Sequence, residues 1–178
     1  MTQTSSSLAW GDLMVNHTGG ILDRYQYMGA RALVLLHEEE LRRFVETWKT
    51  AKDAGIRITG CEDPNYESLE KLVAHVLWWA RDYMTWVCDR LGLPDPEIRM
   101  VPRTDVIEVE LDAYLEHLLD RWRSPLCDIP EEPFFGPQHT TRWGTELPIE
   151  ALLEHAVVHP MRHRLQLLEL VEQANHKE

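Results

Sequence analysis

Residues 147–171 read LPIEALLEHAVVHPMRHRLQLLELV, and this stretch decides the fold class. Its apolar side chains recur at steps of three and four residues, which is the period of an α-helix and not the alternation of a strand. We therefore expect one helix from about residue 148 to about residue 174. The side chains that we expect to face the core include Leu152, Leu153, Leu165 and Leu168.

Residues 21–53 show the same helical period, with Leu36 among the expected core positions. The pattern stops at Asp53-Ala54-Gly55, where the glycine favours the end of a helix. This segment indicates either one long helix or two consecutive helices.

The next helix has the best-marked start in the chain. Asp63 can cap the free backbone N–H groups, and Pro64 suits the first helical position because its missing N–H would be unpaired there. The apolar stripe continues to about Leu91, after which a glycine and two prolines end it. A third helix opens at Asp105 and stops before Pro125.

Four long helices with little strand signal predict an all-α fold of the four-helix-bundle type. Residues 124–146 contain four prolines and are too long for a plain bundle connection, so we expect a loop that packs on the bundle or walls a site. We expect a bundle domain over residues 21–174, a flexible N-terminal arm over residues 1–20 and a polar tail over residues 175–178.

Composition narrows the choice of compartment and partner. The chain has 178 residues, of which 44% are hydrophobic, enough for the core of one domain. No stretch approaches the roughly 18 apolar residues of a membrane span, and the first residues lack the pattern of a signal peptide, so we expect a cytoplasmic protein. A formal net charge of -12 repels nucleic acid and anionic membranes, so we expect neither as a partner. A small-molecule substrate is expected from the histidine motifs described below.

The three cysteines, Cys61, Cys88 and Cys127, lie far apart and form no C-x-x-C pair. Neither a disulfide framework nor a thiolate zinc site is indicated. Cys88 lies within an apolar helical pattern, which favours a core position over a reactive thiol.

His155, His159 and His163 follow one another at intervals of four residues. Side chains four apart share a helical face about 6 Å apart along the axis, so two neighbouring imidazoles can bind one ion. Each step turns about 40° around the helix, and only two of the three can therefore share an ion comfortably. The alternative interpretation is a row of solvated or partly buried histidines without a metal.

His75 lies in the middle of the second helical segment, between Leu72 and Val76. A buried imidazole without a partner would carry a free-energy penalty of a few kcal/mol. A helix bundle directs mid-helix positions at a common interior, where metal sites of bundles are built. A core histidine bonded to one neighbour would satisfy the same requirement, so both interpretations stay open.

Two motifs resemble those of the DinB-like family of metal-binding four-helix bundles. One is the sequence AHVLWW at residues 74–79, and the other is H-x-x-x-H-R-x-Q-L, here residues 159–167. The resemblance extends over nearly the whole chain. It implies a divalent metal ion, Zn, Ni or Fe, held by His75, His159 and His163.

The resemblance also implies roles around that ion. His155 is expected in the second coordination shell or the cavity lining, and so are Trp79, Arg164 and Gln166. For Arg164 and Gln166, charge pairing with acids of the second or third helix and ordinary hydrogen bonds between helices are favoured over a catalytic role. Pro160 departs from the family pattern. It removes one backbone N–H bond and is expected to kink the helix between the two ligands that it separates.

Relatives in that family include enzymes that use low-molecular-weight thiols such as mycothiol and bacillithiol, and homodimers are common. The resemblance therefore implies a metal-dependent enzyme with thiol S-transferase-like chemistry, a thiol co-substrate and catalytic residues that the sequence does not identify. An ion with an open coordination position could instead activate water, as in a metal-dependent hydrolase. The further alternative is a non-catalytic binding or stress-associated bundle whose metal only stabilises the fold.

Overall fold

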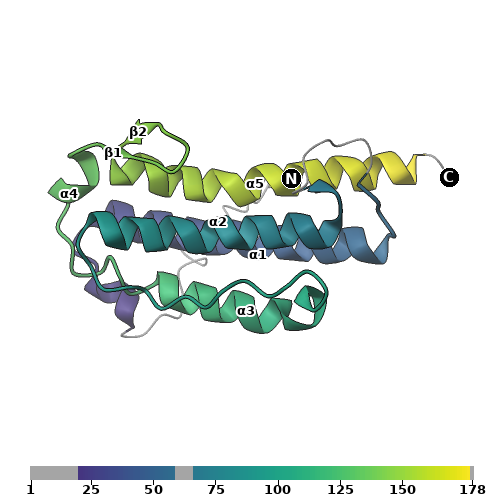
Figure 1. The fold of residues 1–178 in the computed structure, drawn as a ribbon, viewed down its shortest axis with the longest axis horizontal. Coiled ribbons are helices and arrows are strands. Elements are labelled where there is room, and N and C mark those ends of the chain that lie inside the picture. Colours follow the sequence, from purple (N-terminus) through teal and green to yellow (C-terminus); the bar gives the residue numbers. More distant parts are fainter. Residues whose placement is uncertain (1–19, 59–65, 177–178) are drawn as a thin grey trace, which may run out of the picture.

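The computed structural model describes residues 20–58 and 66–176, and in this part of the chain the fold is all-α (Figure 1). A short 3-10 turn at Ile21–Arg24 precedes the first long helix. The long helices are α1 (Met28–Asp53), α2 (Leu69–Arg90), α3 (Ile107–Trp122) and α5 (Ile149–Asn175), and the short elements are α4 (Glu132–Phe135), β1 (His139–Thr140) and β2 (Glu146–Leu147).

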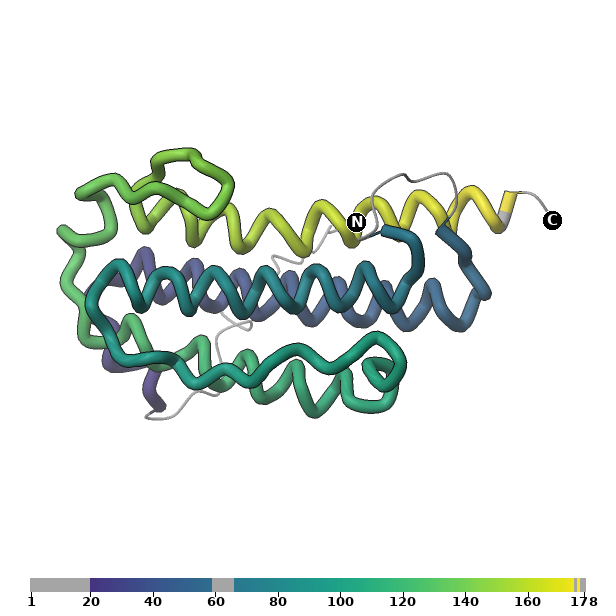
Figure 2. Tube along the Cα trace, in the orientation of Figure 1, coloured from purple at the N-terminus to yellow at the C-terminus, as the bar shows by residue number. Residues whose placement is uncertain are grey.

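The four long helices lie alongside one another (Figures 1 and 2). Helices α1 and α5 run in one direction, and α2 and α3 run in the other. The connector of residues 91–106 makes this possible, because it returns along the length of the bundle before α3 begins (Figure 2). As a result α5, the last helix in the sequence, packs against both α1 and α2.

The first helical segment is divided in two by a turn at Tyr25–Tyr27, so the second of the two alternatives for residues 21–53 is correct. The backbone N–H of Gln26 in this turn donates to the carbonyl of Cys127 at 3.0 Å. This bond ties the turn to the segment that follows α3. The helix proper then starts at Met28 and ends at Asp53, where Gly55 takes a φ of 66°.

Helix α2 begins later than the sequence predicts. Its N-cap is Ser68, whose hydroxyl accepts a hydrogen bond from the backbone N–H of Lys71 at 3.2 Å, and the first helical residue is Leu69. The expected start at Pro64 was therefore wrong, because the serine supplies the cap nearer to the apolar stripe. Asp63 and Pro64 themselves lie outside the described residues.

Other predictions also fall outside the described residues. These are the structure of the N-terminal arm up to residue 19, the environment of Cys61 and the last two residues of the polar tail. The described cysteines, Cys88 and Cys127, are free and buried, and burial raises the pKa of the Cys88 thiol to about 11. A buried thiol that stays protonated at neutral pH agrees with the expected core position of Cys88.

The core lies between the four long helices and includes two fully buried tryptophans. The indole N–H of Trp48 on α1 donates to the carbonyl of Leu69 at 2.6 Å, and that of Trp122 on α3 donates to the carbonyl of Ala80 at 3.0 Å. These bonds satisfy the one polar atom of each indole and link α1 and α3 to the central helix α2.

Several leucines that the sequence assigned to the core lie at the surface instead. Leu36 and Leu165 are each 51% exposed, and Leu168 is 43% exposed. The reason is that polar residues occupy the inward stripes, namely His37 and Glu40 on α1 and two of the histidines on α5. The inward face that is predicted from the apolar residues alone is therefore rotated from the true inward face of each helix by about one residue position.

The proline-rich segment of residues 124–146 is not a plain loop. It contains helix α4 and most of a small antiparallel hairpin, in which His139 pairs with Leu147 and Thr140 with Glu146. The hairpin packs on the first half of α5, so it walls one side of that helix, as expected for this segment.

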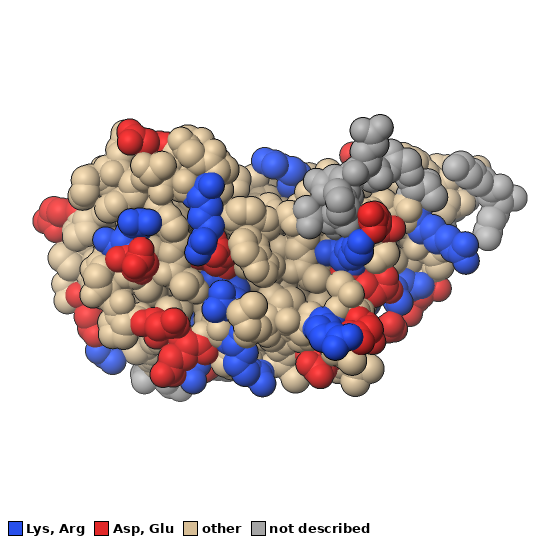
Figure 3. Space-filling model, viewed as in Figure 1, with Lys and Arg blue, Asp and Glu red and all other residues tan. Residues whose placement is uncertain are grey.

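None of the helices in the described part of the chain is both long and apolar enough to span a bilayer. On the face seen in Figure 3, basic and acidic side chains lie next to one another, and no broad basic surface is visible there.

Candidate metal centre

Three histidines from two helices converge in the bundle interior. His75 lies on α2, and His159 and His163 lie one turn apart on the inward face of α5. The Nε2 atom of His159 is 3.3 Å from Nε2 of His75 and 3.3 Å from Nε2 of His163, and the candidate ligand nitrogens of all three lie within 4.8 Å of one another.

These separations fit a shared ion. Nitrogen atoms bound at about 2.0–2.1 Å to one tetrahedral metal ion lie about 3.3–3.4 Å from each other. Two of the three pairs already have this spacing. Three imidazole nitrogens with no carboxylate or thiolate among them could hold an ion such as Zn²⁺, Ni²⁺ or Fe²⁺.

Pro160 does not interrupt the helix that carries two of these residues. Helix α5 is continuous from Ile149 to Asn175, and the buried proline ring lies within it. The rings of His159 and His163 are 4.8 Å apart at 86°, and their Nε2 atoms still meet. The departure from the family motif is thus compatible with both side chains facing the same point.

Burial keeps the two imidazoles on α5 neutral. It lowers the pKa of His159 to about 2, and the neighbouring His163 and His75 add to the effect because a second positive charge there would be repelled. Burial also lowers the pKa of His163. At neutral pH the imidazoles of both residues are therefore unprotonated, which is the form that binds a metal ion.

Gln166 fixes the orientation of one ring. Its Oε1 lies 2.8 Å from Nδ1 of His163, and because an amide oxygen can only accept, Nδ1 of His163 must carry the proton and donate. The lone pair is then on Nε2, which faces the other two histidines. His159 differs, since its buried Nδ1 has no hydrogen-bond partner among the described residues.

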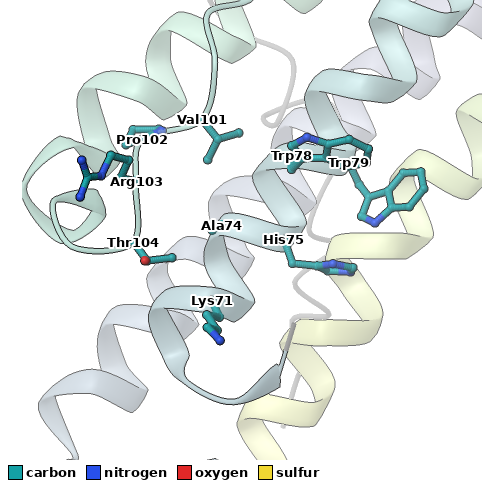
Figure 4. Close-up of a pocket in the computed structure, with 9 residues that line it drawn as sticks. All are labelled: Lys71, Ala74, His75, Trp78, Trp79, Val101, Pro102, Arg103 and Thr104. Atoms are coloured by element: carbon teal, nitrogen blue, oxygen red, sulfur yellow. The ribbon is translucent and has the colours of Figure 1, made fainter. Parts of the chain in front are cut away.

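Aromatic rings enclose the cluster. The ring of Tyr66, in the segment just before α2, lies 5.4 Å from the rings of both His75 and His163. On another side the ring of Trp79 lies 6.4 Å from the rings of His75 and His159. In Figure 4 the side chains of His75 and Trp79 both project from α2 toward α5.

His155 does not belong to the group of three nitrogens that the described residues form. Its ring stacks at 6.3 Å on that of His159 and contacts Tyr83 at 5.6 Å and Trp143 at 5.3 Å. Burial lowers the pKa of His155 as well. The structure therefore places this residue in the wall beside the cluster.

The hairpin closes that wall through an ion pair between an exposed arginine and a buried aspartate. The Nε atom of Arg142, at the hairpin tip, lies 2.7 Å from a carboxylate oxygen of Asp82 on α2, and Asp82 is only 4% exposed. Next to it, the ring of Trp143 lies 5.7 Å from that of Trp79. The turn is closed by Thr141, whose hydroxyl donates to the carbonyl of Thr145 at 2.8 Å.

Arg164 lies on a different side of α5 from Gln166. Its Nε is 3.4 Å from a carboxylate oxygen of Glu40 on α1, and Glu40 is 5% exposed. The acidic partner was expected on the second or third helix, and the correction follows from packing, because α5 lies against α1 along most of its length. Arg164 thus links two helices rather than contacting the histidine cluster.

Two cavities border the cluster. One, of about 680 Å³, lies between α2 and the connector before α3, and His75 and Trp79 form part of its wall (Figure 4). The other, of about 500 Å³, is lined by His159 and His163 together with Tyr66 and residues of the second half of α5. Both volumes are in the range of small-molecule sites.

Sequence reasoning missed Tyr66 and Asp82. Tyr66 lies nine residues before His75 and outside the helix, so no helical spacing connects it with the cluster. Asp82 had a usable signal, because it is a lone acid between the buried residues Ala80 and Tyr83. A buried acid at such a position needs a cationic or hydrogen-bonding partner.

Comparisons of the chain with family models, with curated proteins and with solved structures gave no match.

Proposed function

We propose that this protein is a metal-dependent enzyme of the DinB-like type, with a divalent ion held by His75, His159 and His163. The observation that supports it most is the meeting of three imidazole nitrogens from α2 and α5, two pairs of which have the spacing of ligands around one ion. The motifs at residues 74–79 and 159–167 support the family, and the bundle architecture is compatible with it.

The chemistry that we propose is transfer of a low-molecular-weight thiol to an electrophilic carbon. A divalent ion on three neutral ligands keeps its full charge and an open position, so it would supply stabilisation of a bound thiolate. In the overall reaction the thiol loses its proton to solvent, its sulfur lone pair forms the new C–S bond, and the leaving group departs with the electron pair of the broken bond.

The residues around the cluster have supporting roles in this proposal. Gln166 holds His163 in the tautomer whose Nε2 faces the cluster. Tyr66 and Trp79 cover it on two sides and reduce the access of bulk water, which strengthens electrostatic interactions inside. The two cavities provide space for a thiol and for its acceptor.

Metal analysis tests the site. The purified protein should contain close to one equivalent of a transition metal, and His75→Ala, His159→Ala and His163→Ala should each reduce it sharply. His155→Ala is the matched control, because it removes a neighbouring histidine that is not one of the three. Equal metal content in the control and in the three other variants would contradict the proposed ligands.

A thiol-consumption assay tests the reaction. Loss of free thiol is followed with 1-chloro-2,4-dinitrobenzene as the acceptor and with cysteine, glutathione, mycothiol and bacillithiol in turn. We expect consumption above the uncatalysed rate with at least one thiol, abolished by a chelator and by His75→Ala. Rates equal to the uncatalysed reaction with every thiol, in protein shown to hold metal, would exclude this chemistry.

A non-catalytic, metal-stabilised bundle is the alternative, and one observation favours it. The three histidines belong to two helices, so an ion bound by all of them would cross-link α2 to α5. This alternative predicts tight metal binding and a large gain in stability without turnover of any thiol or ester.

A further inference from the structure

The cavity between α2 and the connector before α3 has apolar walls on both sides. Ala74 and Trp78 come from α2, and Val101 and Pro102 come from the connector (Figure 4). Trp78 is 38% exposed, which is high for so large an apolar side chain and offers a flat ring surface for a ligand. His75 belongs to the same wall, so a molecule bound here lies next to the histidine cluster.

The charges at this cavity have one sign. Lys71 on α2 and Arg103 on the connector are the charged side chains that line it, while the chain as a whole carries a net charge of -12. Their side chains are 42% and 83% exposed, so they lie at the mouth rather than at the floor. An apolar floor with a basic mouth suits an organic anion.

Each of these cations has an acidic neighbour outside the cavity lining. Lys71 pairs with Glu67, and Arg103 pairs with Asp105 at 2.8 Å. Both acids are more than half exposed. Ion pairs so exposed contribute little, so a ligand carboxylate can compete for the cations or share them.

The cavity on the α5 side has a different character. Its lining includes Arg162 and Glu169, charges of opposite sign, together with the amides of Gln166 and Gln173. It therefore shows no preference for an anion. The two cavities meet different members of the histidine cluster, His75 in one case and His159 with His163 in the other.

We propose that the cavity between α2 and the connector binds a small organic anion with a flat, apolar body, such as an aromatic carboxylate. The aromatic part lies against Trp78, and the cationic ends of Lys71 and Arg103, which turn away from Trp78 in Figure 4, swing toward the carboxylate at the mouth. That this anion is the electrophilic substrate rests on the proposed function. The binding itself does not.

Three probes that share one ring system test the preference. 1-Naphthoate, 1-naphthalenemethanol and 1-naphthylmethylammonium carry an anionic, a neutral and a cationic substituent of similar size at the same ring position. Their Kd values are measured by titration calorimetry with the whole chain, with and without metal. We expect naphthoate to bind at least about fivefold more tightly than the alcohol, and the ammonium ion to bind most weakly.

Variants locate the bound probe. Lys71→Gln and Arg103→Gln should each weaken naphthoate binding about fivefold and leave the alcohol unchanged, whereas Trp78→Ala should weaken all three probes. Arg24→Gln is the matched control, because Arg24 is an exposed arginine paired with Asp128 that does not line the cavity. Circular dichroism of each variant shows that the helices are retained.

Equal binding of the three probes, no binding of naphthoate, or equal effects of Arg103→Gln and Arg24→Gln would overturn the proposal. These results are distinguishable from failure of the proposed function. A chain that binds naphthoate but no metal would overturn the enzyme and leave the anion site standing. A metal-loaded chain without a preference for the anion would overturn the anion site and leave the proposed metal site standing.

Discussion

His37 is a core histidine that lies outside the histidine cluster. Its ring stacks on Trp122 with centroids 3.7 Å apart at 14°, and the side chain is 1% exposed. Neither ring nitrogen has a hydrogen-bond partner among the described residues. Burial lowers the pKa of His37 to about 3, because the charged ring would lose its hydration.

We predict that His37→Phe makes stability less dependent on pH. The pKa of His37 in the folded protein, about 3, lies below its value of about 6.5 in the unfolded chain, so stability is complete above pH 6.5 and is lost as the pH falls toward 3. Between pH 7.5 and 5.5 this one group accounts for about 1.4 kcal/mol. Urea unfolding of both proteins at the two pH values, with a chelator present, measures the difference.

The other buried histidines also lower the stability at acidic pH, and they do so equally in both proteins. The informative quantity is therefore how much more stability the wild type loses between pH 7.5 and 5.5 than His37→Phe does. A phenylalanine ring can stack on Trp122 as the imidazole does and brings no unpaired nitrogen, so the variant should also be more stable at pH 7.5. A pH dependence that is the same in both proteins would show that folding does not lower the pKa of His37.

Gln166 gives a second prediction at this scale. Gln166→Ala removes the acceptor that orients His163, and loss of such a partner typically weakens metal binding by about 10–100-fold. Gln166→Glu keeps an acceptor and should retain most of the affinity. Gln173→Ala is the control, because Gln173 lines the same cavity without a hydrogen bond to a histidine in the described structure. Competition with a chromophoric chelator measures the affinities.

Affinities of the Gln166→Ala and Gln173→Ala proteins that agree within error would contradict the orienting role of Gln166. The same titration reports on the proposed ligands, since His163→Ala should lose more affinity than Gln166→Ala.

At the scale of elements, the hairpin depends on one buried carboxylate. We predict that Asp82→Asn loosens residues 139–147, because a neutral amide holds Arg142 less strongly than a carboxylate does. We expect a loss of about 1–3 kcal/mol in local stability, seen as faster amide hydrogen exchange at residues 141–145. Asp120→Asn, on an exposed acid of α3, should have no such effect.

The hairpin carries Trp143, so its loosening should also change tryptophan emission and expose His155. Exchange rates at 141–145 that stay equal to those of the wild type would show that the turn bonds of Thr141 hold the hairpin without the ion pair.

The sequence predicts the number and approximate extent of the long helices, because their apolar period is sustained over many turns. It does not predict which face turns inward where polar residues occupy the core, as with Glu40 on α1 and His163 on α5. It places the start of α2 too early, since Ser68 competes with Asp63 as a cap. The hairpin stayed unpredicted because its strands have two residues each.

For the candidate site, the sequence alone leaves open which two of the three histidines on α5 act together. The structure brings His159 and His163 together with His75, and it leaves His155 one turn away, beside Trp143. The sequence could not predict that Tyr66 contacts the cluster, because only the packing of the segment before α2 brings its ring next to His75 and His163.

At the scale of the whole molecule, the cluster joins the two helices that enclose it. We predict that a saturating metal ion stabilises the protein, by about 2.7 kcal/mol at a free concentration of 100 times Kd. For a domain of this size the thermal midpoint should rise by roughly 5–10 °C. His75→Ala should abolish the shift and His155→Ala should retain it, as measured by differential scanning calorimetry.

A shift of the same size in the His75→Ala protein would indicate that the ion binds elsewhere, for instance at surface carboxylates. A shift in the wild type together with no thiol turnover would favour the metal-stabilised bundle over the enzyme.

The order of the helices in the sequence also determines when the three proposed ligands can come together during synthesis. His75 and His159 are 84 residues apart in the chain. A ribosome has therefore made three of the four long helices before the second proposed ligand is translated, and an ion that reaches the nascent polypeptide earlier finds only one of the three proposed ligands. Binding of one ion by all three proposed ligands must therefore follow the synthesis of α5.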